Sequence, residues 1–504
     1  MGNRVNMRRK GVLLAALGLA LLAAAPTASG ARFGLADDAG KYAEDGGAAF
    51  FSDARALGSS EIRVMVNWDP RRPDAIVERA FLDRSMPIAK KQGLGIVFHV
   101  FPLQPTAITA APDAVESFAS FLQQLSRAYP QVRQFVVGNE PNQPRFWGPQ
   151  FWAGGKPAAA AAYAELLAKS YDALKEVDPG IRVIGLGLSG RGNDSPFALS
   201  NASTSPVRFL RDLGAAYRAS GRALPLMDEL GVHPYPRSDR DSVLAGDRWP
   251  RAGVVNLARI KQAVWDAFAG TGQPTVEQGL GLRIDEIGWQ AAVPASRRGA
   301  YYGRETVAVT SEKAQAANYA KLIALAACDS SISAVYLLHL RDDANLERFQ
   351  SGVRRADGSA RPAYAAVRSA VVQARRGCAG KRVVWRHATG VIGGRAEFRT
   401  GSALVSRLRR SWGFNVTAAE EATYTAALFP AAAATASIRS LAAKGAPGAV
   451  MRTSGRIRAG WNPRLRFEEQ YLRPGRYVYA VRLRASMNPR RSALLVSRPF
   501  VVGP

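Results

Sequence analysis

Residues 132–142, Val-Arg-Gln-Phe-Val-Val-Gly-Asn-Glu-Pro-Asn, contain a short apolar run that ends in a carboxylate, Glu140. A second run of this kind, Leu-Arg-Ile-Asp-Glu at 282–286, ends in Glu286. Each run is typical of a buried strand that gives way to a loop, because branched and aromatic residues favour strands whereas Gly and Pro interrupt them. A carboxylate at the end of a strand lies at the edge of the sheet, where a ligand can reach it.

The region around these two runs alternates between strand and helix patterns. Six further apolar runs with strand character lie at 32–37, 62–67, 94–101, 181–188, 230–235 and 334–340. Helical spacing follows at 74–92, 114–128, 158–177, 206–220, 255–268, 311–328 and 362–375, with a weaker first helix at 48–57. Eight strands that are each followed by a helix predict an α/β fold, a (β/α)8 TIM barrel at 31–377. In such barrels the ligand lies at the C-terminal ends of the strands, where both glutamates are expected.

The pattern changes after Cys378. Short alternating runs appear at 395–399, 450–458 and 477–483, and a Pro-Gly turn at 474–475 precedes the last of them. These runs predict a C-terminal all-β domain, an immunoglobulin-like sandwich, at 381–504.

The first 30 residues have the order of a secretory signal peptide. Four basic residues up to Lys10 precede an apolar run at 11–24, and small residues follow at 28–31. The run is too short to span a bilayer comfortably, and an uncleaved membrane anchor is the alternative. We therefore expect a secreted protein, extracellular or associated with the cell wall, with no stable membrane span after cleavage.

The formal charge of +28 is concentrated in the expected second domain. From Lys381 onward, 22 Lys and Arg residues oppose 5 acidic ones. A basic domain of this kind could bind anionic cell-wall or extracellular polymers. The alternative is a compositional bias, since Arg outnumbers Lys by 56 to 12. Nucleic acid is not an expected partner, because the chain is expected to be exported and shows no nucleic-acid-binding motif.

The chain has two cysteines and four histidines. Cys328 and Cys378 are expected at the C-terminal ends of two neighbouring helices at the bottom of the barrel. Export permits a disulfide between them, and two unrelated thiols are the alternative. The histidines are dispersed along the chain, so we predict neither a metal site nor a cofactor.

The two glutamate motifs carry a resemblance to a known clan. The segments 138–142 (Gly-Asn-Glu-Pro-Asn) and 285–289 (Asp-Glu-Ile-Gly-Trp) resemble those of clan A, the retaining glycoside hydrolases built on the (β/α)8 barrel. The resemblance covers about residues 32–374. It implies cleavage of O-glycosidic bonds of a polysaccharide or oligosaccharide by double displacement, with Glu140 as acid/base and Glu286 as nucleophile. That chemistry needs two carboxyl groups about 5–5.5 Å apart, one protonated and one ionised.

Five further residues resemble positions around the clan's site. Arg63, a charge in an apolar strand, resembles the arginine that supports the nucleophile, and Asn139 resembles the asparagine that binds the sugar 2-hydroxyl. His233 and Tyr235 share one strand face and resemble a pair beside the nucleophile. His99 resembles a strand-three histidine that lines the site, and a core histidine is its alternative.

Strand alternation would place Asn139 and Glu140 on opposite faces, so both reach the cavity only if the strand ends in a bulge or turn. Tryptophans after strand ends are candidate sugar-stacking platforms: Trp68, Trp147, Trp152 and, as the best candidate, Trp289. The clan's tryptophan at the end of strand eight is missing here, and Tyr336, His339 or a loop tryptophan is the expected replacement.

The main alternative to an enzyme is a non-catalytic glycan-binding barrel, tethered by the basic domain to anionic wall polymers. Binding alone does not require both glutamates together with Asn139, so the sequence favours the hydrolase.

Overall fold

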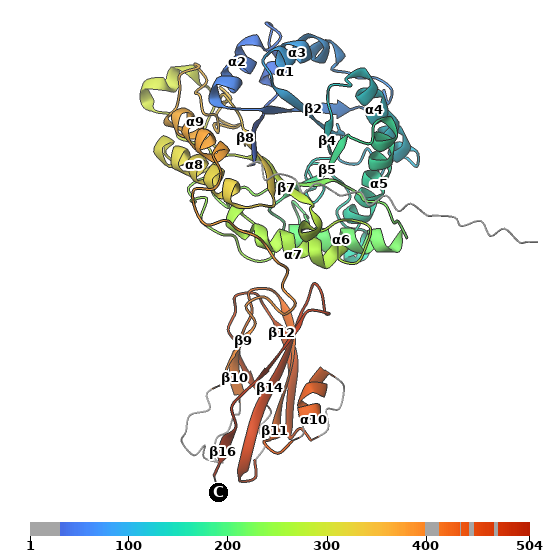
Figure 1. Ribbon diagram of the computed structural model, residues 1–504, viewed down its shortest axis with the longest axis vertical. Coiled ribbons are helices and arrows are strands. Elements are labelled where there is room, and N and C mark those ends of the chain that lie inside the picture. The colour runs from blue at the N-terminus through green and yellow to red at the C-terminus, as the bar shows by residue number, and fades with distance from the viewer. Residues whose placement is uncertain (1–30, 399–412, 434, 443–447, 468–471, 504) are drawn as a thin grey trace, which may run out of the picture.

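The barrel consists of eight parallel strands that close in the order β1 to β8, with helices around them (Figure 1). The computed structural model describes residues 31–398, 413–433, 435–442, 448–467 and 472–503. The strands are β1 (Arg32–Ala36), β2 (Glu61–Trp68), β3 (Gly95–Pro102), β4 (Gln134–Val137), β5 (Arg182–Ser189), β6 (Glu229–His233), β7 (Gly281–Ile287) and β8 (Ile332–Leu338). The predicted TIM barrel is therefore confirmed.

The helices lie between the strands on the outside of the barrel. They are α1 (Ala39–Tyr42), α2 (Ala48–Leu57), α3 (Arg79–Lys91), α4 (Ala114–Ala128), α5 (Ala159–Val177), α6 (Pro206–Ala219), α7 (Leu257–Phe268), α8 (Glu312–Cys328) and α9 (Pro362–Arg375). The prediction placed the start of α3 too early. The residues before it form turns, in which the buried carboxylate of Glu78 accepts hydrogen bonds from Lys41 and from the backbone of Asn67.

Alternating residues of each strand face two different cores. In β4, Phe135 and Val137 belong to the large core between barrel and helices, whereas Val136 belongs to a small cluster inside the barrel. Both faces are buried, which explains why the strands are continuously apolar in sequence. The helices that cover the barrel carry one apolar face each and close the outer core.

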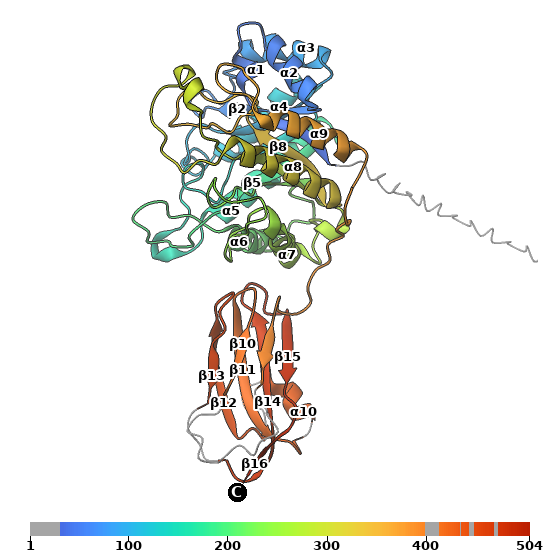
Figure 2. The ribbon, with the colours of Figure 1, turned by 90° about the vertical axis from the view of Figure 1, so that its left-hand side faces the viewer.

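The C-terminal region forms two antiparallel sheets that pack on each other. One sheet has the order β13-β10-β9 and the other β12-β11-β14-β15, with β16 also paired to β14. The strands are β9 (Arg395–Glu397), β10 (Gly413–Thr417), β11 (Ala422–Pro430), β12 (Met451–Ile457), β13 (Arg464–Arg466), β14 (Gly475–Ala485), β15 (Ser492–Val496) and β16 (Phe500–Val502). Phe414 from one sheet and Tyr479 from the other share a core, and a short helix, α10 (Thr435–Arg439), lies beside the larger sheet (Figure 2). The predicted all-β second domain is confirmed.

Helix α7 carries the contact between the two domains. Arg491 of the sandwich is 2% exposed and forms ion pairs with Asp266 on α7 and with Glu420 of its own domain. The rings of Trp265 and His387 stack nearby with centroids 4.1 Å apart. A buried cation shared by both domains thus fixes the sandwich beside this helix.

Cys328, the last residue of α8, forms a disulfide with Cys378, which follows α9, and their Cα atoms are 4.6 Å apart. The disulfide is therefore confirmed over two unrelated thiols. The expected signal peptide lies outside the described residues. Among the residues that the structure describes, no helix is long and apolar enough to cross a membrane.

Candidate active site

The chain turns sharply where β4 ends. The strand stops at Val137 rather than at the predicted Glu140, and Gly138 and Glu140 then adopt φ values of +76° and +39°. A Cβ at Gly138 would lie 2.8 Å from the ring of Tyr163, so this position requires glycine. A positive φ at a residue such as Glu140 costs about 1 kcal/mol or more and is common at functional sites. The turn allows Asn139 and Glu140 to line the same cavity.

That cavity lies at the C-terminal ends of the strands and has a volume of about 570 Å³. Its lining includes Asn139, Glu140, Tyr235 and Glu286. The structure therefore brings both predicted carboxylates into one cavity, of a size suited to a small ligand.

A second cavity, of about 480 Å³, lies at the opposite end of the barrel, around Asp228 and Glu229. Lys175 pairs with Asp228, and Arg182 and Arg283 pair with Glu229. Because these carboxylates are already neutralised by cations, they are poorly suited to acid–base or nucleophilic chemistry.

Glu286 is held as an anion. Arg63, 3% exposed, donates to its Oε2 atom, and the hydroxyl of Tyr235 donates to Oε1 over 2.9 Å. Burial alone would raise the pKa of Glu286, but the positive charges of His233 and Arg63 and the bond from Tyr235 outweigh burial and lower that pKa to about 2. A carboxylate with this pKa stays ionised at neutral pH, as a nucleophile must.

His233 connects Glu140 to a buried aspartate. Its Nδ1 atom is 3.0 Å from Oε1 of Glu140, and its Nε2 atom is 3.2 Å from Oδ1 of Asp285, which is fully buried. Burial would lower the pKa of His233, but the charges of Asp285 and Glu286 raise it to about 10. The ring is therefore an imidazolium that donates from one nitrogen to Glu140 and faces Asp285 with the other. Asp285 belongs to the site, although no role was predicted for it from the sequence.

His99 lies beneath the cavity and is 1% exposed. Burial and the charge of Arg63 lower its pKa to about 3, so the ring is neutral. Arg63 donates to Nδ1 over 2.6 Å, which leaves the proton on Nε2 to donate to the Gly138 carbonyl at 2.9 Å. His99 thus supports Arg63 and the turn before Glu140, and does not line the cavity as predicted, because both of its nitrogens are used in the interior.

The prediction that Trp289 is a sugar platform is wrong. Its side chain is fully buried, its Nε1 atom donates to the carbonyl of Asp241 over 3.0 Å, and its ring packs edge-on against Tyr319. An indole ring with its N–H satisfied and both faces covered cannot stack on a ligand. Trp68 and Trp147 are each 1% exposed and are likewise core residues.

Phenylalanines replace the expected tryptophans in the cavity wall. Phe349 is 41% exposed and, with Phe146, lines the cavity, while the ring of His339 contacts Phe349. Trp152 is 54% exposed but is not among the lining residues. Tyr336 cannot replace the strand-eight tryptophan, because it is fully buried inside the barrel and donates to Glu61.

Three polar groups of the cavity wall lack a partner within the described part of the chain. They are Oδ1 of Asn139, Oε1 of Gln290 and Oγ of Ser351, all buried. Buried polar atoms are normally hydrogen-bonded, so these three are polar groups without a protein partner in residues that line the cavity. Gln290 and Ser351 were missed from the sequence, and only their place in the loops after strands seven and eight could have indicated them.

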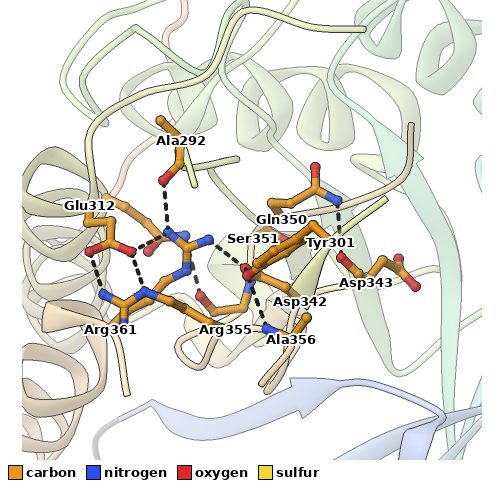
Figure 3. Close-up of polar contacts among 12 residues, drawn as sticks. Ala292, Tyr301, Glu312, Asp342, Asp343, Gln350, Ser351, Arg355, Ala356 and Arg361 are labelled. Atoms are coloured by element: carbon orange, nitrogen blue, oxygen red, sulfur yellow. Dashed lines mark hydrogen bonds and ion pairs between the residues drawn. The ribbon is translucent and has the colours of Figure 1, made fainter. Parts of the chain in front are cut away.

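A buried arginine fixes the loops after β7 and β8 beside the cavity (Figure 3). Arg361 donates to Asp342 and, over 2.9 Å, to Glu312, while the hydroxyl of Tyr301 donates to Asp342 over 2.6 Å. Gln350, next to the lining residues of this wall, donates to two backbone carbonyls of the same loop. The wall is therefore held in one shape by paired charges.

Among the described residues, no group of three or more His, Cys, Asp or Glu side chains is arranged to hold a metal ion.

Comparisons with known proteins add structural neighbours. No protein-family model and no curated protein matches the sequence. A family 39 glycoside hydrolase from the gut symbiont Bacteroides cellulosilyticus WH2 is 15% identical, with a TM-score of 0.48, over 81% of this chain and 75% of that chain. GH5_18 from Streptomyces cattleya is 18% identical, with a TM-score of 0.46, over 71% of this chain and 83% of that chain. Exo-beta-1,4-mannosidase Op5Man5 from Opitutaceae bacterium strain TAV5 is 14% identical, with a TM-score of 0.44, over 69% and 60%. Identities and TM-scores this low assign neither a family nor a reaction to this chain.

Proposed function

We propose that this protein is a retaining glycoside hydrolase that cleaves O-glycosidic bonds, with Glu286 as nucleophile and Glu140 as acid/base. The observation that carries the proposal is the pairing of Glu286 with Arg63 and Tyr235 in a cavity that also holds Glu140. One carboxylate is kept ionised by fixed donors, and the other is free of arginine partners among the described residues. Two carboxyl groups in different environments are what double displacement requires.

In the first step, Oε of Glu286 attacks the anomeric carbon while Glu140 gives its proton to the leaving oxygen. The C–O bond to the leaving sugar breaks, and an ester between sugar and Glu286 forms. Tyr235 and Arg63 hold the attacking carboxylate in place. Their hydrogen bonds to Glu286 weaken as its negative charge is lost to the ester. The imidazolium of His233 stabilises the carboxylate that Glu140 becomes.

In the second step, Glu140 accepts a proton from a water molecule, and the oxygen of that water attacks the anomeric carbon. The ester breaks, Glu286 leaves as a carboxylate, and Glu140 is again protonated. Two inversions at one carbon give net retention of its configuration.

The test uses Glu286→Gln and Glu140→Gln, with Glu165→Gln on the exposed face of α5 as the matched control. We expect Glu286→Gln to lower kcat by about 10⁴-fold or more, since no ester can form. Glu140→Gln should lose activity on natural glycans and keep part of it on aryl glycosides, whose leaving groups need little protonation. Turnover by Glu286→Gln at the wild-type rate would refute the assignment, and an inverted product seen by NMR would refute the retaining mechanism.

We also propose that the protein is exported and that its basic sandwich binds anionic polymers outside the cell. The N-terminal pattern and the charge from residue 381 onward support both ideas. Pull-down of the full chain by anionic wall polymers should weaken steadily as salt rises, because such binding is electrostatic. Binding of glycan with no hydrolysis of any member of a glycan panel would favour the non-catalytic alternative.

A further inference from the structure

Three arginines line the same cavity as the two glutamates, one from each of three consecutive loops. Arg145 follows β4, Arg191 follows β5 and Arg251 follows β6. No carboxylate oxygen of the described residues lies within 4.0 Å of any of these guanidinium groups. Arg145 and Arg191 are exposed and Arg251 is half-buried, whereas the fully buried arginines Arg283 and Arg361 of the same domain each pair with a carboxylate.

Backbone carbonyls hold two of these guanidinium groups in position. Arg191 donates to the carbonyl of Pro236, and Nε of Arg251 donates to the carbonyl of Gly192 over 3.2 Å. A guanidinium carries five N–H donors, so each group keeps donors for a ligand. Each of the two guanidinium groups is held by one backbone carbonyl, and its remaining N–H donors are available in the cavity wall.

The carboxylates of the cavity do not balance these charges. The lining contains Glu140, Glu286 and Asp239 as its acidic residues. Glu286 pairs with Arg63, Glu140 pairs with His233, and Asp239 accepts a hydrogen bond from the backbone of Gln290 over 2.9 Å. The three arginines therefore face one lining carboxylate, Asp239, that has no cationic partner within 4.0 Å among the described residues.

We propose that the substrate is an anionic glycan whose carboxylate or sulfate oxygens are bound by Arg191 and Arg251. This inference rests on the proposed hydrolase function. A neutral sugar presents only hydroxyl groups, so it carries no charge for these guanidinium groups to bind. An acidic sugar adds an anion whose two oxygens fit the paired N–H groups of a guanidinium. Arg145, Arg191 and Arg251 together form an arginine wall. It begins at the loop that carries Glu140, so it lies beside the bond to be cleaved.

The experiment compares native acidic polysaccharides with their neutralised forms. The panel contains uronic-acid polymers with their carboxyl-reduced derivatives, and sulfated polymers with their desulfated derivatives. We expect kcat/KM for one native acidic polymer to exceed that for its neutral derivative by about tenfold or more, as charge-assisted hydrogen bonds predict. The derivative that loses activity identifies the anion as carboxylate or sulfate.

Two variants connect this preference to the arginine wall. Arg191→Gln and Arg251→Gln should each reduce the ratio of the two kcat/KM values toward one. Arg133→Gln, which removes an exposed arginine at the other end of the barrel, should keep the wild-type ratio. A wild-type ratio near one, or a ratio that neither cavity variant changes, would overturn the inference while leaving the hydrolase assignment intact.

Failure of the hydrolase assignment itself gives a different result. In that case no polymer is cleaved, and calorimetry with Glu286→Gln decides whether acidic oligosaccharides bind. Binding that is lost in Glu286→Gln combined with Arg191→Gln would still support the anionic ligand. Absence of any binding or cleavage of acidic glycans would overturn it.

Discussion

Replacing Arg63 with methionine tests the electrostatic design of the site without any substrate. Arg63 is 3% exposed, donates to Glu286 and lies 3.9 Å from the fully buried Asp285. The depression of the pKa of Glu286 from 4.5 to about 2 corresponds to about 3 kcal/mol in favour of its ionised form. Removing one partner of a buried ion pair costs about 3–5 kcal/mol, because it leaves a charge without compensation. We expect Arg63→Met to lower the free energy of unfolding by that amount at pH 7.

The direction in which stability changes with pH follows from the pKa of Glu286 in the folded wild type and in folded Arg63→Met. In the wild type, the folded pKa of Glu286 lies below the unfolded value, so its stabilisation is present above pH 4.5 and is lost as the pH falls through about 2. In the variant, the pKa of Glu286 loses the lowering effect of Arg63 and rises above its wild-type value, so the penalty present at pH 7 is relieved as the pH falls through that raised pKa. The difference between the two proteins should shrink by about 1.4 kcal/mol for each pH unit below the variant's pKa.

The assay is urea-induced unfolding of the full chain at pH 7, 6, 5 and 4, followed by fluorescence and circular dichroism. Arg72→Met is the matched control, because this arginine is exposed and its partner Asp69 keeps a second ion pair, with Arg71. It should change stability by less than about 0.5 kcal/mol at each pH. A loss below about 1 kcal/mol for Arg63→Met at pH 7 would refute the reasoning.

Three further changes test other parts of the molecule. Gly187 has φ +49° and a Cβ there would lie 3.1 Å from His233, so Gly187→Ala should reduce kcat/KM by about tenfold or more in the hydrolysis assay. Cys328→Ser opens a disulfide that spans 50 positions and should destabilise the protein by about 4 kcal/mol, measured against the wild type with and without reductant. Arg491→Met leaves Asp266 without its buried cation and should accelerate proteolysis between the domains, while an unchanged cleavage rate would show that the contact is not stabilising.

The sequence was sufficient for the barrel because its strands are buried on both faces. Runs such as 94–101 are continuously apolar, and the helices between them carry one apolar face, so the period of the pattern changes at each boundary. Boundaries failed where a buried charge changed the local structure. Glu78 holds the turns before α3 through Lys41, and no pattern in the apolar residues marks a contact between positions so far apart.

The candidate site was predictable in its carboxylates and not in its aromatic wall. Glu140 and Glu286 each stand at the end of an apolar run, so their place at the strand ends followed from the fold. Trp289 also follows a strand end, yet its N–H finds the carbonyl of Asp241 and its ring turns into the core. Whether a loop side chain points into the core or the cavity depends on such hydrogen-bond partners. These partners cannot be identified from the position of the residue in the sequence.

Asp285 shows why the charged residues that support the two glutamates are harder to predict than the glutamates themselves. By alternation, Asp285 and Glu286 point to opposite sides of the strand, yet both contact Arg63, because β7 changes register against β8 between Ile284 and Ile287. That irregularity lets a single arginine and His233 hold two adjacent carboxylates. With Asp285 ionised and buried, His233 stays protonated, and the proton on His233 is what faces Glu140 as it loses its own. Asp285 therefore acts on the proposed acid only through His233, which contacts both carboxyl groups.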